Sequence, residues 1–210
     1  IQSLLEDHKF KLKKCSILCI GDMILDHYIS GKINRMSPEA PIPILDIESD
    51  IYELGGVGNV ARNITSFGSK ATVLYLSGKD NASKKINELL IQNKNIKIIN
   101  IKNSDYIMPH KTRYISKSNH LLRVDREFLE FRLTKNVSNK IINKVKKIIK
   151  NFDLIILSDY SKGVLNKNMI KKIINIAHEH SKIIIADPKK IDLSCYAKID
   201  ILTPNQKEIT

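Results

Sequence analysis

The sequence has no tryptophan, few cysteines and no long hydrophobic stretch. Its three cysteines cannot form a disulfide framework and fit no metal-ligand spacing, so we expect a cytoplasmic protein. No segment approaches the roughly 20 consecutive apolar residues that a transmembrane helix needs, and residues 1–16 do not resemble a signal peptide. These absences exclude a transmembrane protein and predict no membrane partner.

The chain has a net charge of +13, with 35 basic and 22 acidic residues among 210. Such a charge raises the hypothesis of a nucleic-acid binder. Only six of the basic residues are Arg, and the basic residues are spread along the chain. Ile and Asn are also abundant, so a general bias in amino-acid composition is the better interpretation. The absence of tryptophan also leaves little for base stacking. We therefore predict no nucleic-acid partner.

Short apolar runs recur along the chain and predict buried strands. They are rich in Ile, Val and Leu, which suits strands covered on both faces. Helical spacing of apolar residues predicts helices between them, over 57–67, 141–149 and 169–177, with Gly68 ending the first. This alternation indicates a doubly wound α/β fold with a mainly parallel central sheet. The predicted strands are 16–20, 71–76, 96–101, 154–157, 183–186 and 199–202.

Two segments, about 28–51 and 106–125, break this alternation. The first contains three prolines and no helical spacing, and the second alternates loosely between apolar and polar residues. We predict that both form antiparallel strands outside the main sheet, as a small β-sheet lid over one end of the core. The alternative is two surface hairpins without a role.

Functional groups gather where four of the predicted strands end. Ligands of open parallel sheets bind at the carboxyl ends of the strands, so these groups predict a site at one edge. Carboxylates, lysines and an asparagine suit sugar hydroxyls and a Mg²⁺–phosphate partner. The groups are Asp22 and Asp26, then Asp159 and Lys162, then Asp187 and Lys189, and finally Asn205 and Glu208.

The glycine cluster that begins at Gly55 has two interpretations. Gly56, Gly58 and Ala61 fit the loose dinucleotide pattern G-x-G-x-x-A, but no buried first strand precedes them. Glycines that let the backbone approach a ligand at a helix N-terminus are the better interpretation. The chain contains no G-x-x-x-x-G-K-[ST] loop, which excludes a P-loop kinase.

Taken together, the motifs resemble those of the ribokinase-like (PfkB) sugar kinases, over nearly the whole chain. The glycine motif and N-x-x-E occur throughout that family, whereas S-P-E-A-P and S-D-Y-x-K-G are specific to its heptose 7-phosphate kinases. The resemblance implies a three-layer α/β/α fold with a β-sheet lid. The matching segments are 21–28, 35–43, 55–61, 111–113, 121–127, 158–163, 187–189 and 203–208.

On the sugar side, the resemblance implies that the carboxylate of Asp26 binds hydroxyls. Gly55, Gly56 and Asn59 would line the sugar pocket.

Further substrate-binding residues are implied on and beside the lid. Lys111 and Arg113 would face the sugar and its 7-phosphate, for which a guanidinium offers bidentate contact. Asp125 and Asp159 are also expected on the sugar side.

On the nucleotide side, the resemblance implies that the ATP phosphates lie near Lys162, Asp187 and Lys189. Asn205 and Glu208, the first and last residues of the N-x-x-E element, would bind Mg²⁺ through water molecules. The predicted nucleotide-binding residues are Lys162, Asp187, Lys189, Asn205, Gln206, Lys207 and Glu208.

The reaction implied is in-line transfer of the ATP γ-phosphoryl group to the 1-hydroxyl of D-glycero-β-D-manno-heptose 7-phosphate. The product would be the 1,7-bisphosphate, an intermediate of ADP-heptose and lipopolysaccharide core synthesis. Cofactors would be ATP and Mg²⁺, and lids of this family often pair, so a homodimer through the lid is a further expectation. The alternatives are a fructokinase- or ribokinase-like sugar kinase and a non-catalytic sugar-phosphate-binding protein.

The sequence departs from the family in lacking the G-x-G-D motif that carries the catalytic Asp. His110 stands where Thr is common, and Asn119 and His120 where a Gln pair is common, which puts the lid contacts in question. We therefore expect residues 1–210 to be the N-terminal two-thirds of a kinase domain, inactive alone and without a catalytic residue of their own.

Overall fold

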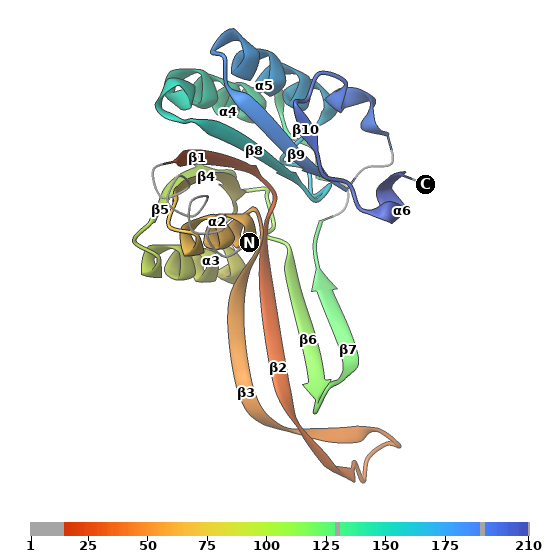
Figure 1. Cartoon of the computed structure of the whole chain (residues 1–210). Helices are drawn as coiled ribbons and strands as arrows, with labels where there is room; N and C mark the ends of the chain where they lie inside the picture. The colour runs from red at the N-terminus through yellow and green to blue at the C-terminus, as the bar shows by residue number, and fades with distance from the viewer. Residues whose placement is uncertain (1–14, 129–130, 190–191, 210) are drawn as a thin grey trace.

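The computed structural model describes residues 15–128, 131–189 and 192–209, which build a layered α/β core and a second sheet projecting from it (Figure 1). The core sheet has six strands in the order β10-β9-β8-β1-β4-β5, and every neighbouring pair is parallel. The strands are β1 (Ser16–Gly21), β4 (Lys70–Ser77), β5 (Ile96–Lys102), β8 (Leu154–Asp159), β9 (Ile183–Pro188) and β10 (Ile201–Leu202).

Alternate residues of the central strand β1 point to opposite faces and enter two separate cores. Leu18 and Ile20 pack with the helices on one face, whereas Ile17 and Cys19 pack with those on the other. This double burial confirms the prediction of a three-layer α/β arrangement. The first face is covered by α4 (Lys135–Ile148) and α5 (Lys167–Glu179), and the second by α2 (Val57–Ser66) and α3 (Asn81–Gln92).

The predicted lid is a four-stranded sheet in the order β3-β2-β6-β7, which we call the lid sheet. Its strands are β2 (Met23–Met36), β3 (Pro43–Gly56), β6 (His110–Ser116) and β7 (Asn119–Arg126). The outer pairs are antiparallel, as predicted, but β2 and β6 are parallel, because each begins at the core and runs outward (Figure 1).

The bounds of some elements differ from the prediction. β2 begins at Met23 rather than near residue 28, because its first residues are apolar and no turn separates them from β1. β10 is only Ile201–Leu202. Helix α3 was not predicted, since Ser83, Ile86 and Leu90 are its only buried residues and form a short stripe.

Three short elements complete the described chain. A 3₁₀ turn, η1 (Ile149–Asn151), follows α4, a second, η2 (Leu193–Tyr196), precedes β10, and α6 (Gln206–Ile209) ends it. No helix among the described residues is long and apolar enough to cross a membrane.

Candidate functional site at the carboxyl edge of the sheet

Asp22, directly after β1, holds the loop that follows β8. Its carboxylate is fully buried and accepts hydrogen bonds from the backbone N–H groups of Tyr160 at 2.9 Å, Lys162 at 3.0 Å and Val164 at 3.0 Å. Burial raises the pKa of Asp22 to about 6, against the effect of these three bonds. The S-D-Y-x-K-G segment is therefore held by a carboxylate that was predicted at this edge without a specific role.

At the base of the lid sheet, the predicted sugar residue Asp26 pairs with Arg113. The two residues come from the adjacent strands β2 and β6, and Arg113 Nη1 lies 2.6 Å from Asp26 Oδ1. Both side chains are less than one-fifth exposed, and the ring of Tyr28 lies 5.1 Å from the guanidinium carbon. The structure thus joins an anion and a cation that the sequence separates by 87 positions.

Gly55 and Gly56 allow the backbone to approach the Asp26 carboxylate and the Asp22 main chain closely. A Cβ atom on Gly55 would lie 2.1 Å from Asp26 Oδ2, and one on Gly56 would lie 2.2 Å from the carbonyl oxygen of Asp22. Gly56 also has φ +57°, in the region that favours glycine, where helix α2 begins. The glycines thus allow close packing against Asp26 and Asp22, and their predicted approach to a ligand stays a prediction.

The other predicted sugar residues surround this pair less closely. Lys111 lies beside Asp26 in the β2–β6 register, and Asp125 lies opposite Lys111 in β7. Asp125 is exposed and pairs with Arg123 at 3.0 Å. Asn59 is exposed in the first turn of α2.

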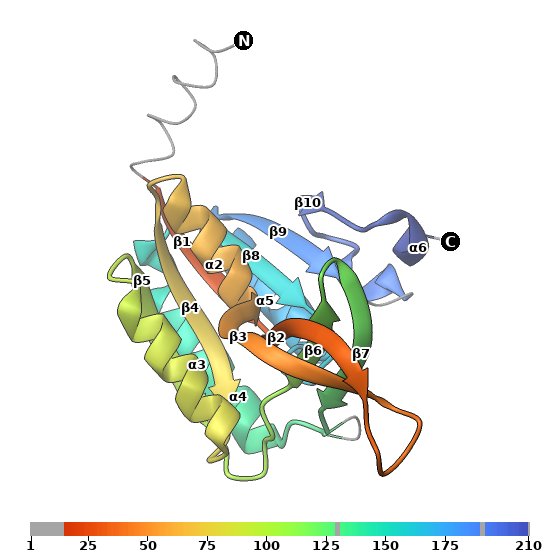
Figure 2. The same ribbon diagram turned by 90° about the horizontal axis from the view of Figure 1, so that it is seen from below.

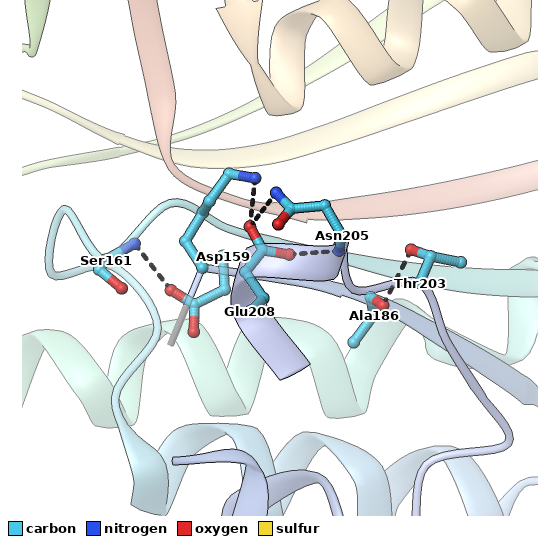
Figure 3. Close-up of polar contacts among 7 residues, drawn as sticks. Asp159, Ser161, Ala186, Thr203, Asn205 and Glu208 are labelled. Carbon is cyan, nitrogen blue, oxygen red and sulfur yellow. Dashed lines mark hydrogen bonds and ion pairs between the residues drawn. The ribbon is translucent and has the colours of Figure 1, made fainter. Parts of the chain in front are cut away.

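The predicted N-x-x-E element folds onto itself after β10. Glu208, in α6, accepts hydrogen bonds from the backbone N–H of Asn205 and from Asn205 Nδ2, both at 2.7 Å (Figure 3). Lys189, which follows β9, places its Nζ 2.5 Å from Glu208 Oε1, the same oxygen that Asn205 Nδ2 contacts. The hydrogen bond from Lys189 lowers the pKa of Glu208. The side chain of Lys207 lies outside the described residues, and Gln206 opens α6.

Tyr160 lies between the two groups of predicted residues. Its ring is 5.6 Å from Lys189 Nζ, and its pKa is raised by burial and by the negative charges of Asp187, Asp26 and Glu208. The pKa of Asp187 is also raised, mainly by burial and in part by Glu208, while Lys189 opposes the shift. Residues of the sugar-side and nucleotide-side sets are therefore close enough to act on the same tyrosine.

Asp159 and Lys162 are bound within the protein. Asp159 is fully buried and accepts hydrogen bonds from Tyr196 Oη at 2.6 Å and from the backbone N–H of Ser161 at 2.9 Å. Lys162 Nζ lies 2.5 Å from Glu127 Oε2, an ion pair that joins the loop after β8 to the segment leaving the lid. Their predicted ligand roles stay predictions.

The donor set at this edge fits a phosphate-bound Mg²⁺ ion better than a cage made of protein alone. No group of three or more His, Cys, Asp or Glu side chains among the described residues could hold a metal. Mg²⁺ commonly uses one or two carboxylates together with substrate phosphates. Asp187 and Glu208, whose charges affect each other, provide that number.

Tyr28 and Tyr160 were not predicted as site residues, and Asp22 was predicted at this edge without a specific role. Tyr160 lies inside the S-D-Y-x-K-G motif, and its position after β8 is the signal that could have marked it. No local signal marks Tyr28, because its contact with Arg113 depends on strand pairing.

Comparison with known proteins supports the resemblance. The pattern of the "pfkB family carbohydrate kinase" matches residues 14–210. The chain is 38% identical over 202 residues to the bifunctional protein HldE of Aliarcobacter butzleri, which covers 93% of this chain and 41% of that protein. It is 36% identical over 197 residues to HldE of Nitrobacter winogradskyi, covering 93% of this chain and 40% of the relative. The chain thus spans about two-fifths of the length of these relatives.

Solved structures show the same fold at low sequence identity. Phosphofructokinase-2 from Escherichia coli, in a tetrameric inhibited form, gives a TM-score of 0.69 at 19% identity and covers 92% of this chain and 62% of its own. A possible 1-phosphofructokinase from Thermotoga maritima gives 0.70 at 15% identity, covering 91% and 61%. With its parallel core, lid sheet and matching pattern, the chain belongs to the pfkB family of carbohydrate kinases.

Proposed function

We propose that the protein transfers the γ-phosphoryl group of ATP to the 1-hydroxyl of D-glycero-β-D-manno-heptose 7-phosphate. The family membership supports a sugar kinase, and the HldE relatives together with the S-P-E-A-P and S-D-Y-x-K-G segments support the heptose substrate. The observation that carries the proposal is the Asp26–Arg113 pair at the base of the lid, on the edge that also holds Lys189 and Glu208.

In this proposal, Asp26 accepts hydrogen bonds from sugar hydroxyl groups. Arg113, released in part from Asp26, binds the phosphate of the substrate, with Lys111 as a second cation from the same strand. The Tyr28 ring keeps the guanidinium in place through its face, which is worth about 0.5–1 kcal/mol at an exposed site. A phosphorylated sugar therefore suits this edge better than a neutral one.

The nucleotide side is proposed to hold the ATP phosphates through lysines and the N-x-x-E element. Lys189 and Asn205, now hydrogen-bonded to Glu208, would exchange part of that network for phosphate oxygens. Asp187 and Glu208 would bind Mg²⁺ through water, and the ion neutralises charge on the phosphates when bound. Lys162, Gln206 and Lys207 complete the proposed set.

The test is ADP release by the native-length protein supplied with Mg-ATP. Heptose 7-phosphate is compared with ribose and fructose 6-phosphate, and the 210-residue chain, which contains no G-x-G-D motif, is expected to release no ADP. If the protein turns over only a different sugar, that sugar is the substrate and the heptose assignment is wrong. Binding of heptose 7-phosphate without any turnover would favour a non-catalytic sugar-phosphate-binding protein.

The variant Asp26→Ala tests the sugar site separately. It should raise the KM for heptose 7-phosphate by about 10-fold or more, because a buried partner of sugar and Arg113 is lost, and leave the ATP affinity unchanged. Exposed Asp46→Ala in the lid sheet is the matched control. Unchanged sugar affinity in Asp26→Ala would contradict the assignment.

We also propose that two copies associate through their lid sheets. Large apolar side chains of the lid are exposed, among them Met36, Ile47, Leu122 and Val124. Exposed apolar side chains of this size on both edges of one sheet favour a protein interface. Sedimentation should show a dimer that Ile47→Asp with Leu122→Asp converts to a monomer, whereas a wild-type monomer would contradict the proposal.

A further inference from the structure

A cavity of about 570 Å³ lies at the base of the lid sheet, on the face opposite Asp26. Leu25 lines the cavity while its neighbour Asp26 pairs with Arg113, and successive side chains of a strand point to opposite faces. Helix α3 forms the other wall, and Figures 1 and 2 show α3 and α6 on opposite sides of the lid sheet. The cavity is therefore separate from the candidate site, and its volume falls within the range of small-molecule sites.

Basic side chains from three elements line this cavity: Lys85 of α3, His110 of β6 and Arg126 of β7. The one carboxylate among the lining residues, Asp80, already accepts hydrogen bonds from the backbone N–H groups of Ser83 and Met108, both at 2.7 Å. Over the described part of the chain, Arg126 has no carboxylate within ion-pair distance. Lys85 also forms an ion pair with Glu88 of the same helix at 3.3 Å. Among the lining residues, Lys85 and Arg126 are the permanent cations, against the single carboxylate of Asp80.

The amino end of α3 also lies at the cavity, where the Asp80 carboxylate already accepts a hydrogen bond from one of its N–H groups, that of Ser83. Asn81 and Ala82, the first two residues of this 12-residue helix, also line the cavity. The N-terminus of a helix carries a partial positive charge and backbone N–H groups suited to an anion. An anionic group here would meet two permanent cations, Lys85 and Arg126, and the ring of His110, whose pKa is lowered by burial and by the neighbouring His27 and Arg126.

A flat aromatic wall completes the cavity. The ring of Tyr52, which lines it, stacks on His27 with centroids 3.9 Å apart and planes inclined by 12°, and His110 lies 5.6 Å from His27 on a similar plane. Asp50 Oδ1 lies 2.6 Å from His27 Nε2, which fixes the buried middle ring. Lys85 Nζ lies over the Tyr52 ring, 5.1 Å from its centroid, and His27 is stacked on the same ring, so a ligand ring would contact Tyr52 at its edge.

We propose that this cavity binds a small phosphate ester that has a flat ring. The phosphate would lie among Lys85, His110 and Arg126, and the ring would pack against Tyr52 and the apolar side chains of Leu25 and Met108. Charge-assisted hydrogen bonds supply the specificity for the phosphate, and edge-to-face packing of the ring supplies apolar contact. This proposal does not depend on the kinase reaction proposed above.

The probe is phenyl phosphate, titrated by calorimetry against the native-length protein. Phenol and inorganic phosphate serve as the ring-only and phosphate-only comparisons. We expect phenyl phosphate to bind at least about 10-fold more tightly than either, since it engages both parts of the cavity. NMR should also show contacts between the phenyl protons and the Met108 methyl group.

Variants separate this cavity from the candidate site. The double variant Lys85→Ala with Arg126→Ala should weaken phenyl phosphate binding by about 10-fold or more, while Lys84→Ala, an exposed neighbour on α3, should have no effect. Arg113→Ala, on the opposite face, should also leave the affinity unchanged. Loss of binding in Arg113→Ala with retention in the double variant, or no saturable binding at millimolar phenyl phosphate, would overturn the proposal.

Discussion

At the scale of single residues, Asp22 shows how a buried charge can organise a loop. Three backbone N–H groups from residues 160–164 converge on one carboxylate whose exposure is 0%. Removing a buried acceptor leaves each of these donors unpaired, and each such donor costs about 1–3 kcal/mol. The loop that carries Tyr160 and Lys162 therefore depends on Asp22.

We expect Asp22→Ala to lower the free energy of unfolding by about 2–4 kcal/mol, since relief of the buried charge offsets part of the lost hydrogen bonding. Urea unfolding followed by circular dichroism measures the change. Asp105→Ala, at an exposed position, is the control and should stay within about 0.5 kcal/mol of the wild type. An equally small change in Asp22→Ala would show that the loop does not need this anchor.

Asp22 should also titrate near pH 6, because burial raises its pKa from 3.8 to about 6. A carboxyl group whose folded pKa is raised takes up a proton more readily in the folded state than in the unfolded state. Its contribution to stability is thus complete below pH 4 and is lost as the pH rises through 6. Carboxyl ¹³C NMR should show a resonance with a midpoint near 6 that is absent from Asp22→Asn; a midpoint near 4 would contradict the expectation.

Gly55→Ala should displace the Asp26 carboxylate without unfolding the protein. The new Cβ would lie 2.1 Å from Asp26 Oδ2, the far end of a side chain that can move. Movement would break the hydrogen bond between Arg113 and Asp26, so sugar-phosphate affinity should fall by about 10-fold while the thermal midpoint changes little. Gly31→Ala is not a suitable control, because its Cβ would meet backbone atoms. Unchanged affinity in Gly55→Ala would show that the pair tolerates displacement.

At the scale of elements, helices α3 and α4 both begin with a side-chain cap, but only the cap of α3 also binds a distant segment. Thr134 caps α4 by accepting a hydrogen bond from the N–H of Val137 at 3.3 Å. Asp80 caps α3 through Ser83, and its second oxygen accepts from Met108 in the segment before β6. Asp80 thus caps the start of a core helix and also joins it to the segment that leads into the lid sheet.

Asp80→Ala should consequently cost more stability than Thr134→Ala. Loss of a simple cap costs about 1 kcal/mol, and loss of the second buried bond adds about 1–3 kcal/mol. Chemical unfolding of the two variants side by side measures the difference. Equal costs would mean that the Met108 contact contributes nothing beyond the cap.

At the scale of the whole molecule, the charge of +13 should produce weak, non-specific DNA binding only. Dispersed lysines attract phosphate backbones without reading bases, so we expect dissociation constants of roughly 1–100 µM at physiological salt, equal for unrelated sequences. Fluorescence anisotropy with two unrelated duplexes measures this. Nanomolar affinity for one of them would revive the nucleic-acid hypothesis.

Much of the core could be predicted because its signals are local. The run 16–20 is apolar throughout and becomes β1, and the helical spacing around Val60 and Ile64 becomes α2. Helix α3 could not be predicted in this way, because a helix at the rim of a core needs only a narrow apolar stripe. The parallel pairing of β2 and β6 was also beyond the sequence pattern, since both orientations present the same alternation.

The sequence by itself determined which chemical groups stand at strand ends, because strands and the residues that follow them are specified by near neighbours. It also determined the family, through motifs that extend over nearly the whole chain. Only the tertiary structure decided which groups meet: Asp26 with Arg113, Lys189 with Glu208, and Asp22 with the loop at Tyr160. It likewise decided that Leu25 and Asp26, adjacent in sequence, belong to different sites, because the pleat of a strand turns neighbours to opposite faces.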